Sequence, residues 1–238
     1  HDGCNRRRVQ RAFPVPAQGP LALTTIPPLR FVVVGTGRCG TTYTAQLLQR
    51  AGIPVDHEVI FTEKGPQQVE HLEGDASWMA VPYLAGFPGS ILHQVREPLA
   101  VIDSLLDLGL FASVFADEIH RPWRRFLEAH FPLCGDPVLD AMRFYVQWNL
   151  RCEEHADLRI RIEDQCTLIP EFIDRLYPGK GALVESHLPR VSTKLNSREE
   201  RRVKRTRAVG LSIEDLPGGK DRDALLAMAE RYGYVRSG

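Results

Sequence analysis

The most informative residues for chemistry lie in the stretch FVVVGTGRCGTT, residues 31–42. Gly35 and Gly40 have the Gly-x-x-x-x-Gly spacing of a phosphate-binding loop, in which backbone N–H groups and a helix N-terminus bind an anion. A lysine follows the second glycine in the nucleotide-hydrolysing version of this loop, but this chain has a threonine there. Its cation is Arg38, inside the loop, with a planar fork of donors. We therefore predict a phosphate site without the lysine that reaches a γ-phosphate.

Two threonines and a cysteine extend the predicted anion site. The hydroxyls of Thr41 and Thr42 lie where a helix is expected to begin, so they can donate to a phosphate together with the backbone. Cys39 is a small residue in the turn, and we expect its N–H to face the phosphate rather than its thiol to act as a nucleophile. The predicted phosphate-binding residues of the loop are Arg38, Cys39, Gly40, Thr41 and Thr42.

A second anion site is predicted at the end of a later apolar strand. Residues 90–95 read SILHQV and are followed by Arg96, where a nucleotide hydrolase usually has an acidic residue that helps to hold Mg²⁺. An arginine there repels a metal and attracts an anion, so no metal site is expected. Ser104 follows eight residues later, about two turns into the next predicted helix. We expect Arg96 and Ser104 to converge on one phosphate.

Two anion sites with one arginine in each suit a nucleotide that carries phosphate groups at both ends of its ribose. With these residues the chain resembles the sulfotransferase family, whose sulfate donor is 3′-phosphoadenosine 5′-phosphosulfate. GTGRCGTT, residues 35–42, is similar to the family's 5′-phosphosulfate loop. VREPLAVIDS, residues 95–104, is similar to its 3′-phosphate motif, and IRIEDQ, residues 160–165, to a later strand ending in Glu-Asp. The resemblance covers residues 31–170 and implies a P-loop-like fold, with this donor as co-substrate and no metal.

The resemblance also implies an activity, which is transfer of a sulfuryl group to a hydroxyl of a sugar or other small-molecule acceptor. Such a transfer needs a general base for the acceptor proton and a cation near the leaving phosphate oxygen. Arg38 is placed for the second task. Glu58, after the second predicted strand, is the favoured base, as in related carbohydrate and protein-tyrosine sulfotransferases. His57 is its rival, because another branch of the family uses histidine, and Glu63 is a third choice.

Two other functions stay open at this point. A small-molecule kinase with an altered loop would need ATP and Mg²⁺, and Asp56 is the candidate metal ligand near the loop. A non-catalytic nucleotide-binding or scaffold protein would keep the fold and lack the base. The resemblance is looser beyond residue 170, where STKLNSR, residues 192–198, matches only in outline the basic lid that the family often has over the nucleotide.

Composition and charge narrow the range of partners. The chain of 238 residues is 43% hydrophobic and 25% charged, the balance of a globular protein, with a formal net charge of +0. No overall positive field favours nucleic acid, and no apolar run reaches the roughly 18 residues that a membrane span needs. The five cysteines have no CxxC spacing, which is typical of reduced thiols, so we expect a cytoplasmic protein.

Strands and helices are predicted to alternate along the chain. Residues 1–30 contain several prolines and are predicted to be an extended arm, with residues 31–238 forming a single domain. We expect an α/β fold in which helices cover both faces of a parallel sheet, in a P-loop-like three-layer architecture. The predicted strands are 31–34, 53–55, 90–95 and 158–162, the predicted helices are 41–51, 77–85, 101–111, 121–131, 138–155, 168–177 and 221–232, and 59–75 is a predicted loop. For the aromatic residues Phe111, Phe115, Trp123 and Phe126, pocket wall, core and dimer contact all stay open.

Overall fold

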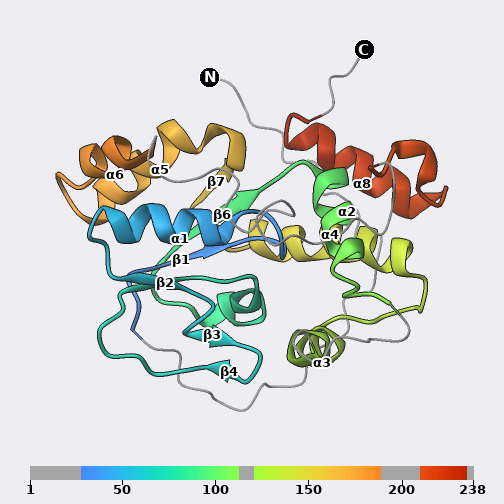
Figure 1. Cartoon of the computed structure of the whole chain (residues 1–238), viewed down its shortest axis with the longest axis horizontal. Coiled ribbons are helices and arrows are strands. Elements are labelled where there is room, and N and C mark those ends of the chain that lie inside the picture. Colours follow the sequence, from blue (N-terminus) through green and yellow to red (C-terminus); the bar gives the residue numbers. More distant parts are fainter. Residues whose placement is uncertain (1–27, 113–120, 189–209, 235–238) are drawn as a thin grey trace, which may run out of the picture.

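A computed structural model describes residues 28–112, 121–188 and 210–234 of the chain. At its centre is a sheet of five strands in the order β2-β5-β1-β6-β7, and every neighbouring pair runs parallel. Helices cover both faces of this sheet (Figure 1), which confirms the predicted α/β fold. The strands are β1 (Phe31–Val34), β2 (Val55–His57), β5 (Gly74–Ala76), β6 (Ser90–Val95) and β7 (Leu158–Arg161).

The remaining elements are helices and one short hairpin. Two helices begin with acidic caps. Glu97 accepts hydrogen bonds from the first free N–H groups of α2, and Asp136 accepts them from the first free N–H groups of α4. Both helices have proline in the first turn. The hairpin pairs β3 (Phe61–Thr62) with β4 (Gly65–Pro66). The helices are α1 (Thr41–Arg50), α2 (Pro98–Asp107), α3 (Arg121–His130), α4 (Pro137–Glu153), α5 (Gln165–Leu176), α6 (Gly181–His187) and α8 (Lys220–Arg231), with 3₁₀ helices η1 (Trp78–Gly86), η2 (Ile162–Asp164) and η4 (Ile213–Asp215).

The central strand β1 separates two apolar cores. Its four residues are completely buried, and because side chains alternate along a strand, neighbours face opposite sides of the sheet. Phe31 and Val33 pack with apolar residues of α1, α5 and α6. Val32 and Val34 pack with residues of η1, α2, α3, α4 and α8. Burial on both faces is typical of a parallel sheet and explains why β1 is apolar at every position.

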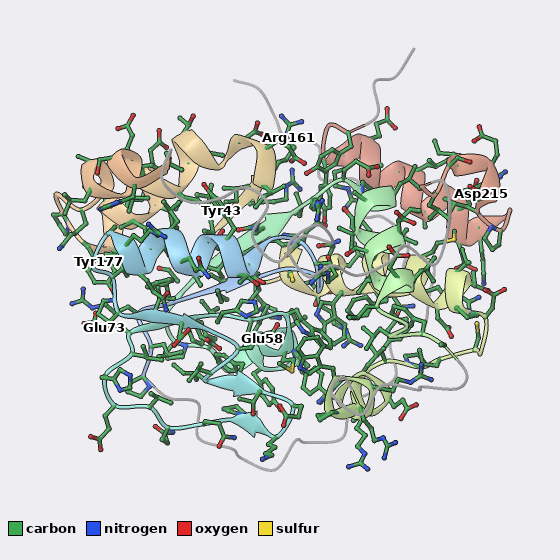
Figure 2. The ribbon with its side chains drawn as sticks, in the orientation of Figure 1. Tyr43, Glu58, Glu73, Arg161, Tyr177 and Asp215 are labelled. Carbon is green, nitrogen blue, oxygen red and sulfur yellow. The ribbon has the colours of Figure 1, made fainter. Side chains whose placement is uncertain are left out.

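An ionic and aromatic cluster closes one end of the sheet, away from Glu58 (Figure 2). Arg30 Nε lies 3.1 Å from Glu73 Oε2, and the Arg30 guanidinium lies 4.9 Å from the centre of the Tyr177 ring. The Tyr177 hydroxyl donates to Glu73 at 2.9 Å. These contacts join the chain before β1 and β5 to the end of α5, so the opposite end of the sheet is the one left to form a site.

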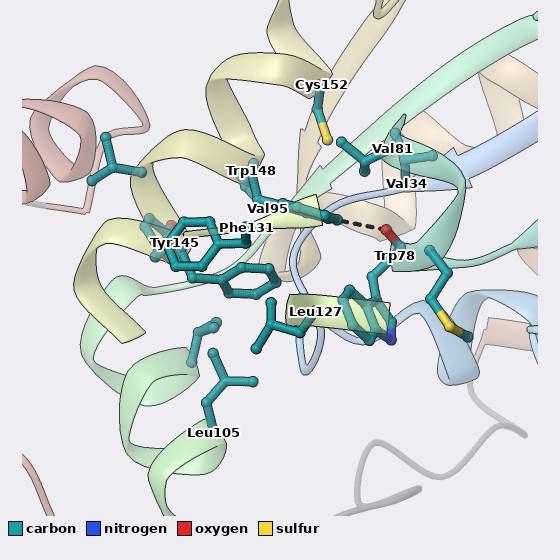
Figure 3. Close-up of a cluster of buried hydrophobic side chains, with 14 of the residues drawn as sticks. Val34, Trp78, Val81, Val95, Leu105, Leu127, Phe131, Tyr145, Trp148 and Cys152 are labelled. Carbon is teal, nitrogen blue, oxygen red and sulfur yellow. Dashed lines mark hydrogen bonds between the residues drawn. The ribbon is translucent and has the colours of Figure 1, made fainter. Parts of the chain in front are cut away.

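The larger core is built around aromatic side chains of η1 and α4. The Trp78 ring lies with its centre 5.8 Å from those of both Phe144 and Trp148, and Trp148 Nε1 donates to the Trp78 carbonyl at 2.9 Å (Figure 3). Phe126 of α3 meets Trp78 edge-on at 5.3 Å. Because the buried indole N–H of Trp148 has a partner, this packing carries no desolvation penalty for it. The contacts hold η1 and α3 firmly against α4.

The prediction of a loop over residues 59–75 is wrong at its C-terminal end, where the last two residues belong to a central strand. Gly74–Ala76 forms β5 between β2 and β1, with Gly74 paired to Phe31 and Asp75 to Val32. Glycine and aspartate are depleted in strands, so local propensity gave no signal. Glycine is needed at position 74 because three carbons of the Phe31 ring lie 2.8 Å or less from where a Cβ would be.

Two further predictions are corrected near this strand. The second strand is Val55–His57 rather than 53–55, since Pro54 has no N–H group for the hydrogen-bond ladder. Residues 77–85 were predicted as a helix, and they form a 3₁₀ helix that is shifted by one residue. Pro82 inside this segment explains the absence of a regular α-helix, because proline removes a backbone donor.

The helix predicted over 101–111, for which Pro98 suits the first turn, ends earlier than expected. It starts at Pro98 and stops at Asp107, and Gly109 follows with a φ of 71°, a left-handed conformation typical of helix ends. The helix α6 was not predicted. The other predicted strands and helices agree with the structure to within three residues at each end.

Some predictions fall on residues outside the described ranges. These are positions 1–27 of the arm, the lid segment 192–198 and Phe115. In the part of the chain that the structure describes, no helix is both long and apolar enough to cross a membrane.

Gly74→Ala should destabilise the protein, because the added methyl group forces the buried Phe31 ring and β5 apart. Overpacking of this kind costs about 1–3 kcal/mol, which urea unfolding followed by circular dichroism would measure. Gly218→Ala is the matched control, since its added Cβ would come no nearer than 3.8 Å to Arg222. Equal stability of the two variants would contradict the packing of Gly74 against Phe31.

Candidate functional site

The glycine loop between β1 and α1 contains two glycines that the surrounding space requires. A side chain at Gly35 would clash with the Gln94 carbonyl of the neighbouring strand β6. Gly40 has a φ of 99°, and an added Cβ would lie 2.5 Å from Ile162 Cδ1. Gly40 is also the N-cap of α1 and brings no capping side chain. A helix that starts in this way suits an anion, which can accept the first N–H groups of the helix.

A buried amide holds this loop against the sheet. Gln94, in β6, donates from Nε2 to the Cys39 carbonyl at 2.9 Å and accepts at Oε1 from the Thr44 hydroxyl at 2.6 Å. All three residues are completely buried. Removal of either partner would leave a buried polar group unsatisfied, which is costly. The loop and the first turn of α1 are therefore tied to β6 as one unit.

Cys39 lies inside this unit rather than at a reactive surface. Burial raises the pKa of its thiol to about 12, so the thiol is protonated at neutral pH. Its backbone N–H donates to the Thr36 carbonyl at 3.3 Å. Because the thiolate is the nucleophilic form of cysteine, this environment favours a structural role for the side chain. The contact between the Cys39 N–H and a phosphate stays a prediction.

Arg38, Arg96 and Ser104 come together although they are far apart in the sequence. Arg38 Nε donates to Ser104 Oγ at 2.9 Å, and Arg96 Nη1 donates to the Arg38 carbonyl at 3.2 Å. The Tyr145 hydroxyl donates to the Arg96 carbonyl at 2.7 Å and so fixes the end of β6 from α4. The sequence paired Ser104 with Arg96, whereas the structure pairs it directly with Arg38. Both arginines line one cavity, so the two predicted anion sites are neighbours.

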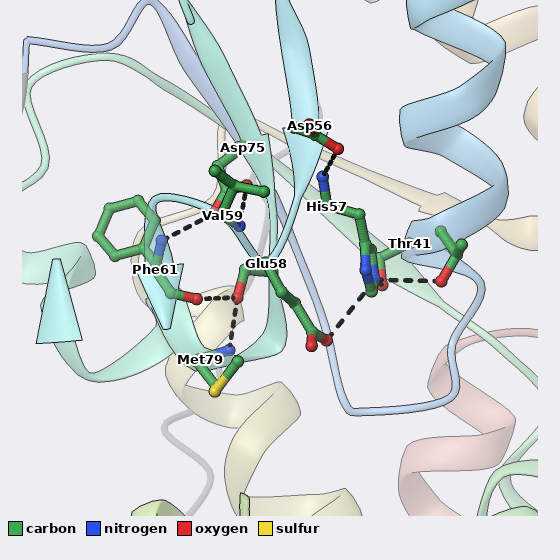
Figure 4. Close-up of polar contacts among 10 residues, drawn as sticks. Thr41, Asp56, His57, Glu58, Val59, Phe61, Asp75 and Met79 are labelled. Carbon is green, nitrogen blue, oxygen red and sulfur yellow. Dashed lines mark hydrogen bonds and ion pairs between the residues drawn. The ribbon is translucent and has the colours of Figure 1, made fainter. Parts of the chain in front are cut away.

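The candidate bases come at the end of β2, across from the loop (Figure 4). His57 Nε2 lies 3.1 Å from the hydroxyl oxygens of both Thr41 and Thr42, and 3.6 Å from Glu58 Oε1. His57 and Glu58 both line the cavity, whereas Glu63 is not among its described lining residues. The structure thus brings the favoured base and its rival to the threonines that are predicted to bind phosphate.

Backbone strain marks the two residues that the sequence predicts to be catalytic. Among the described residues other than glycine, positive φ values occur at Arg38, with 73°, and Glu58, with 58°. A left-handed conformation costs such residues on the order of 1–2 kcal/mol, and it persists only where the surroundings enforce it. Because strain of this kind gathers at functional sites, its position supports the assignment of both residues to the site.

A buried carboxyl group helps to enforce the conformation at Glu58. Asp75, in β5, accepts the N–H groups of Phe61 at 2.8 Å and Val59 at 3.3 Å, and the Ser77 hydroxyl donates to the Phe61 carbonyl at 2.8 Å (Figure 4). Burial raises the pKa of Asp75 to about 7, although the backbone hydrogen bonds act in the opposite direction. The residues that follow Glu58 are therefore fixed from β5, which leaves Glu58 at the bend of the turn.

A cavity of about 500 Å³ collects these residues at the carboxyl ends of the strands, where α/β sheets commonly bind ligands. Its volume is typical of small-molecule sites. Its polar lining includes Arg38, Gly40, Thr41, Thr42, His57, Glu58 and Arg96, and its apolar lining includes Trp78, Leu105, Leu108, Leu110 and Trp123. Of the aromatic residues left open by the sequence, Trp123 lies in the cavity wall, while Phe111 and Phe126 belong to the core.

Comparison with known proteins does not assign this chain to a family or a function. No protein-family model matches the chain, and a search of curated proteins finds no match. Within the described ranges, no group of three or more His, Cys, Asp or Glu side chains is arranged to hold a metal ion. Asp56, the candidate metal ligand of the kinase alternative, accepts from Gln49 Nε2 at 3.2 Å and from the His57 N–H at 2.8 Å. The residues that line the cavity are therefore the basis for assigning a function.

Three residues that shape the site are not among those predicted from the sequence. Gln94 carried a signal, because a polar residue in a strand expected to be buried on both faces must find hydrogen-bond partners. Asp75 carried none, since its segment was predicted as a loop. Tyr145 is 49 residues away from Arg96 in the sequence, so only the packing of α4 beside α2 and β6 brings the two together.

Asp75→Asn should remove one component of the pH dependence of folding. A carboxyl group whose pKa rises on folding binds its proton more tightly in the native state, so the native protein loses stability as the pH rises from about 4 to about 7. The variant lacks this loss. At about 1.4 kcal/mol per pKa unit, the difference in unfolding free energy between the two proteins should change by on the order of a few kcal/mol. Urea titrations between pH 4 and 8 would measure it, and a constant difference would contradict the raised pKa.

Proposed function

We propose that this protein is a sulfotransferase that moves a sulfuryl group from 3′-phosphoadenosine 5′-phosphosulfate to a hydroxyl of a sugar or other small-molecule acceptor. The observation that carries the proposal is the convergence of Arg38, Arg96 and Glu58 on one cavity beside the glycine loop. Two guanidinium groups and a helix N-terminus suit a nucleotide with two phosphate positions. A carboxylate opposite them suits removal of the acceptor proton. The likeness of both sequence motifs to the family supports the same donor.

The residues present fit this donor in charge and in shape. The start of α1 with Thr41 and Thr42 would hold the 5′-phosphosulfate, in a cradle that a side chain at Gly40 would fill. Arg96 and Ser104 would hold the 3′-phosphate. The hydrogen bond from Arg38 Nε to Ser104 Oγ holds the Arg38 guanidinium group beside the residue proposed to bind the 3′-phosphate.

The proposed reaction forms a bond between the acceptor oxygen and sulfur as the bond between sulfur and the leaving phosphate oxygen breaks. Glu58 accepts the proton of the acceptor hydroxyl, and the arginines stabilise the negative charge that develops on the leaving phosphate. The products are a sulfate ester and adenosine 3′,5′-bisphosphate. His57 contacts both Glu58 and the two threonine hydroxyls, so it orients the base relative to the bound phosphate.

Net charge and the cysteines bear on partners and location. Zero net charge gives no support for a nucleic-acid partner. A cytoplasmic location is part of the proposal on the basis of the cysteines, of which Cys39, Cys134 and Cys152 are unpaired in the structure.

Arg38→Ala and Arg96→Ala should each weaken the binding of adenosine 3′,5′-bisphosphate by more than tenfold. Each change removes hydrogen bonds from a charged group, worth about 1.5–3 kcal/mol, and isothermal titration calorimetry would measure the Kd. Arg50→Ala is the matched control, because Arg50 is exposed in the last turn of α1. Unchanged binding in both site variants would contradict the proposal. So would a preference of the native protein for ATP with Mg²⁺, the result that a kinase would give.

Glu58→Gln should lower kcat at least about 100-fold, the range expected for loss of a general base, while the Kd for the bisphosphate stays within a factor of three. Radiolabelled sulfate transfer would report kcat, and calorimetry the Kd. Glu171→Gln, on the exposed face of α5, is the matched control and should keep full activity. Full activity of Glu58→Gln would move the base to another residue, with His57 the first to test.

A further inference from the structure

The cavity has two walls of different chemistry. One wall is polar and consists of the loop, the start of α1, the end of β2 and the end of β6. The other wall is apolar and is supplied by η1, the end of α2 with the residues after it, and α3. Its described members are Trp78, Leu105, Leu108, Leu110 and Trp123. The proposed function uses only the polar wall, for the donor and the base.

The apolar wall begins directly beside the phosphate loop. A Cβ added at Gly37 would lie 3.7 Å from Leu105 Cδ2 and 3.8 Å from Trp78 Cγ, which is van der Waals contact. The side chains of the wall therefore reach the loop backbone without an intervening layer. A molecule whose hydroxyl lies between Glu58 and the loop must place its remaining atoms along this wall.

The position of this wall is set by the core behind it. Trp78 is only 3% exposed, and its ring meets Phe126 and Phe144 edge-on, at 5.3 and 5.8 Å. On the outer side, Arg124 Nη1 donates to the Leu110 carbonyl at 2.8 Å, which joins α3 to the segment after α2. The apolar surface is thus a fixed extension of the core rather than a set of loose side chains.

The described residues of this wall include no charged side chain and no side-chain amide, and their polar side-chain atoms are the indole nitrogens of Trp78 and Trp123. Against the leucine side chains of this wall, hydroxyl or carboxylate groups of a ligand would lose water without gaining a partner, which is unfavourable. Aliphatic or aromatic atoms would instead be removed from water, which is favourable. The charged residues of the cavity, Arg38, Arg96, His57 and Glu58, all lie on the opposite wall, where the proposed function already uses them.

We infer that the acceptor is an uncharged alcohol or phenol with an apolar body. Its hydroxyl faces Glu58, and its hydrocarbon or aromatic part packs against Trp78, Leu108 and Trp123. This inference rests on the proposed function and narrows its acceptor from small molecules in general to one chemical class. Sugars, which carry a hydroxyl group on most of their carbon atoms, fit the leucine-lined part of this wall less well.

The test compares three acceptors with the native protein at a fixed, saturating concentration of the donor. The probes are 2-naphthol, glucose and glucuronate. We expect kcat/KM for 2-naphthol to exceed that for each sugar by at least about tenfold, because several apolar carbon atoms are buried only in the first case. Calorimetry of the bisphosphate-loaded protein would measure binding of each probe apart from turnover, and 2-naphthol should bind most tightly.

A pair of variants tests the wall itself. Leu108→Asn places an amide in the wall at a half-buried position and should raise KM for 2-naphthol at least tenfold, with little change in kcat. Leu183→Asn is the matched control, because Leu183 is 44% exposed on α6. An unchanged Kd for the bisphosphate shows that each variant is folded. Leu108→Met, which keeps this position apolar, should have the native KM for 2-naphthol.

The outcomes separate the acceptor class from the proposed function. Absence of 2-naphthol binding, tighter binding of glucose or glucuronate, or an unchanged KM in Leu108→Asn would overturn the acceptor class while leaving the sulfotransferase proposal intact. Failure of the native protein to bind the bisphosphate would contradict the sulfotransferase proposal, and the acceptor class with it. Preferred use of 2-naphthol together with the raised KM would support both.

Discussion

The buried amide of Gln94 is the contact on which the candidate site depends most. Its donor side and its acceptor side bind different elements, the loop carbonyl of Cys39 and the helix hydroxyl of Thr44. An apolar residue of the same size would leave both partners unsatisfied, and a carboxylate would offer no donor to the carbonyl. Arg96 comes directly after the end of the same strand, so one element both holds the loop and brings a cation to it.

The site is held together at a local energetic cost that the rest of the fold offsets. Arg38 and Glu58 have left-handed backbones, and Asp75 is buried in an environment that disfavours its charge. Each of these costs is on the order of 1 kcal/mol or more, which is a notable part of the stability of an ordinary domain. The two cores on either side of β1 provide the compensating burial. A sequence optimised for stability alone would have removed these features.

The two walls of the cavity belong to different layers of the molecule and are constrained differently. The polar wall comes from chain segments at the strand ends, where backbone geometry sets each side chain. The apolar wall grows out of the core, and its innermost member, Trp78, cannot change without repacking Phe144 and Trp148. Its outer member, Leu108, is only half-buried. Changes in the ligand that this wall accepts are therefore least disruptive at its outer rim.

The sequence by itself determined the glycine loop, the helix that follows it, the α/β class and the candidate residues Arg38, Arg96 and Glu58. These features depend on neighbours within a few positions, and short-range spacing and strand patterns record such neighbours directly. The pairing of Arg38 with Ser104 spans 66 residues. No local pattern records a contact of that length, so the sequence assigned Ser104 to Arg96.

Only the tertiary structure decided where β5 lies. Its three residues have little strand propensity, and they form a strand because β1 and β2 supply hydrogen-bond partners on both sides. That insertion puts Asp75 under the turn that carries Glu58. Likewise, the apolar wall exists because packing on α4 brings Trp78 next to a loop more than 35 residues earlier in the sequence. Contacts between distant segments are chosen by the packing of the whole core, and for that reason no stretch of the sequence read alone could show them.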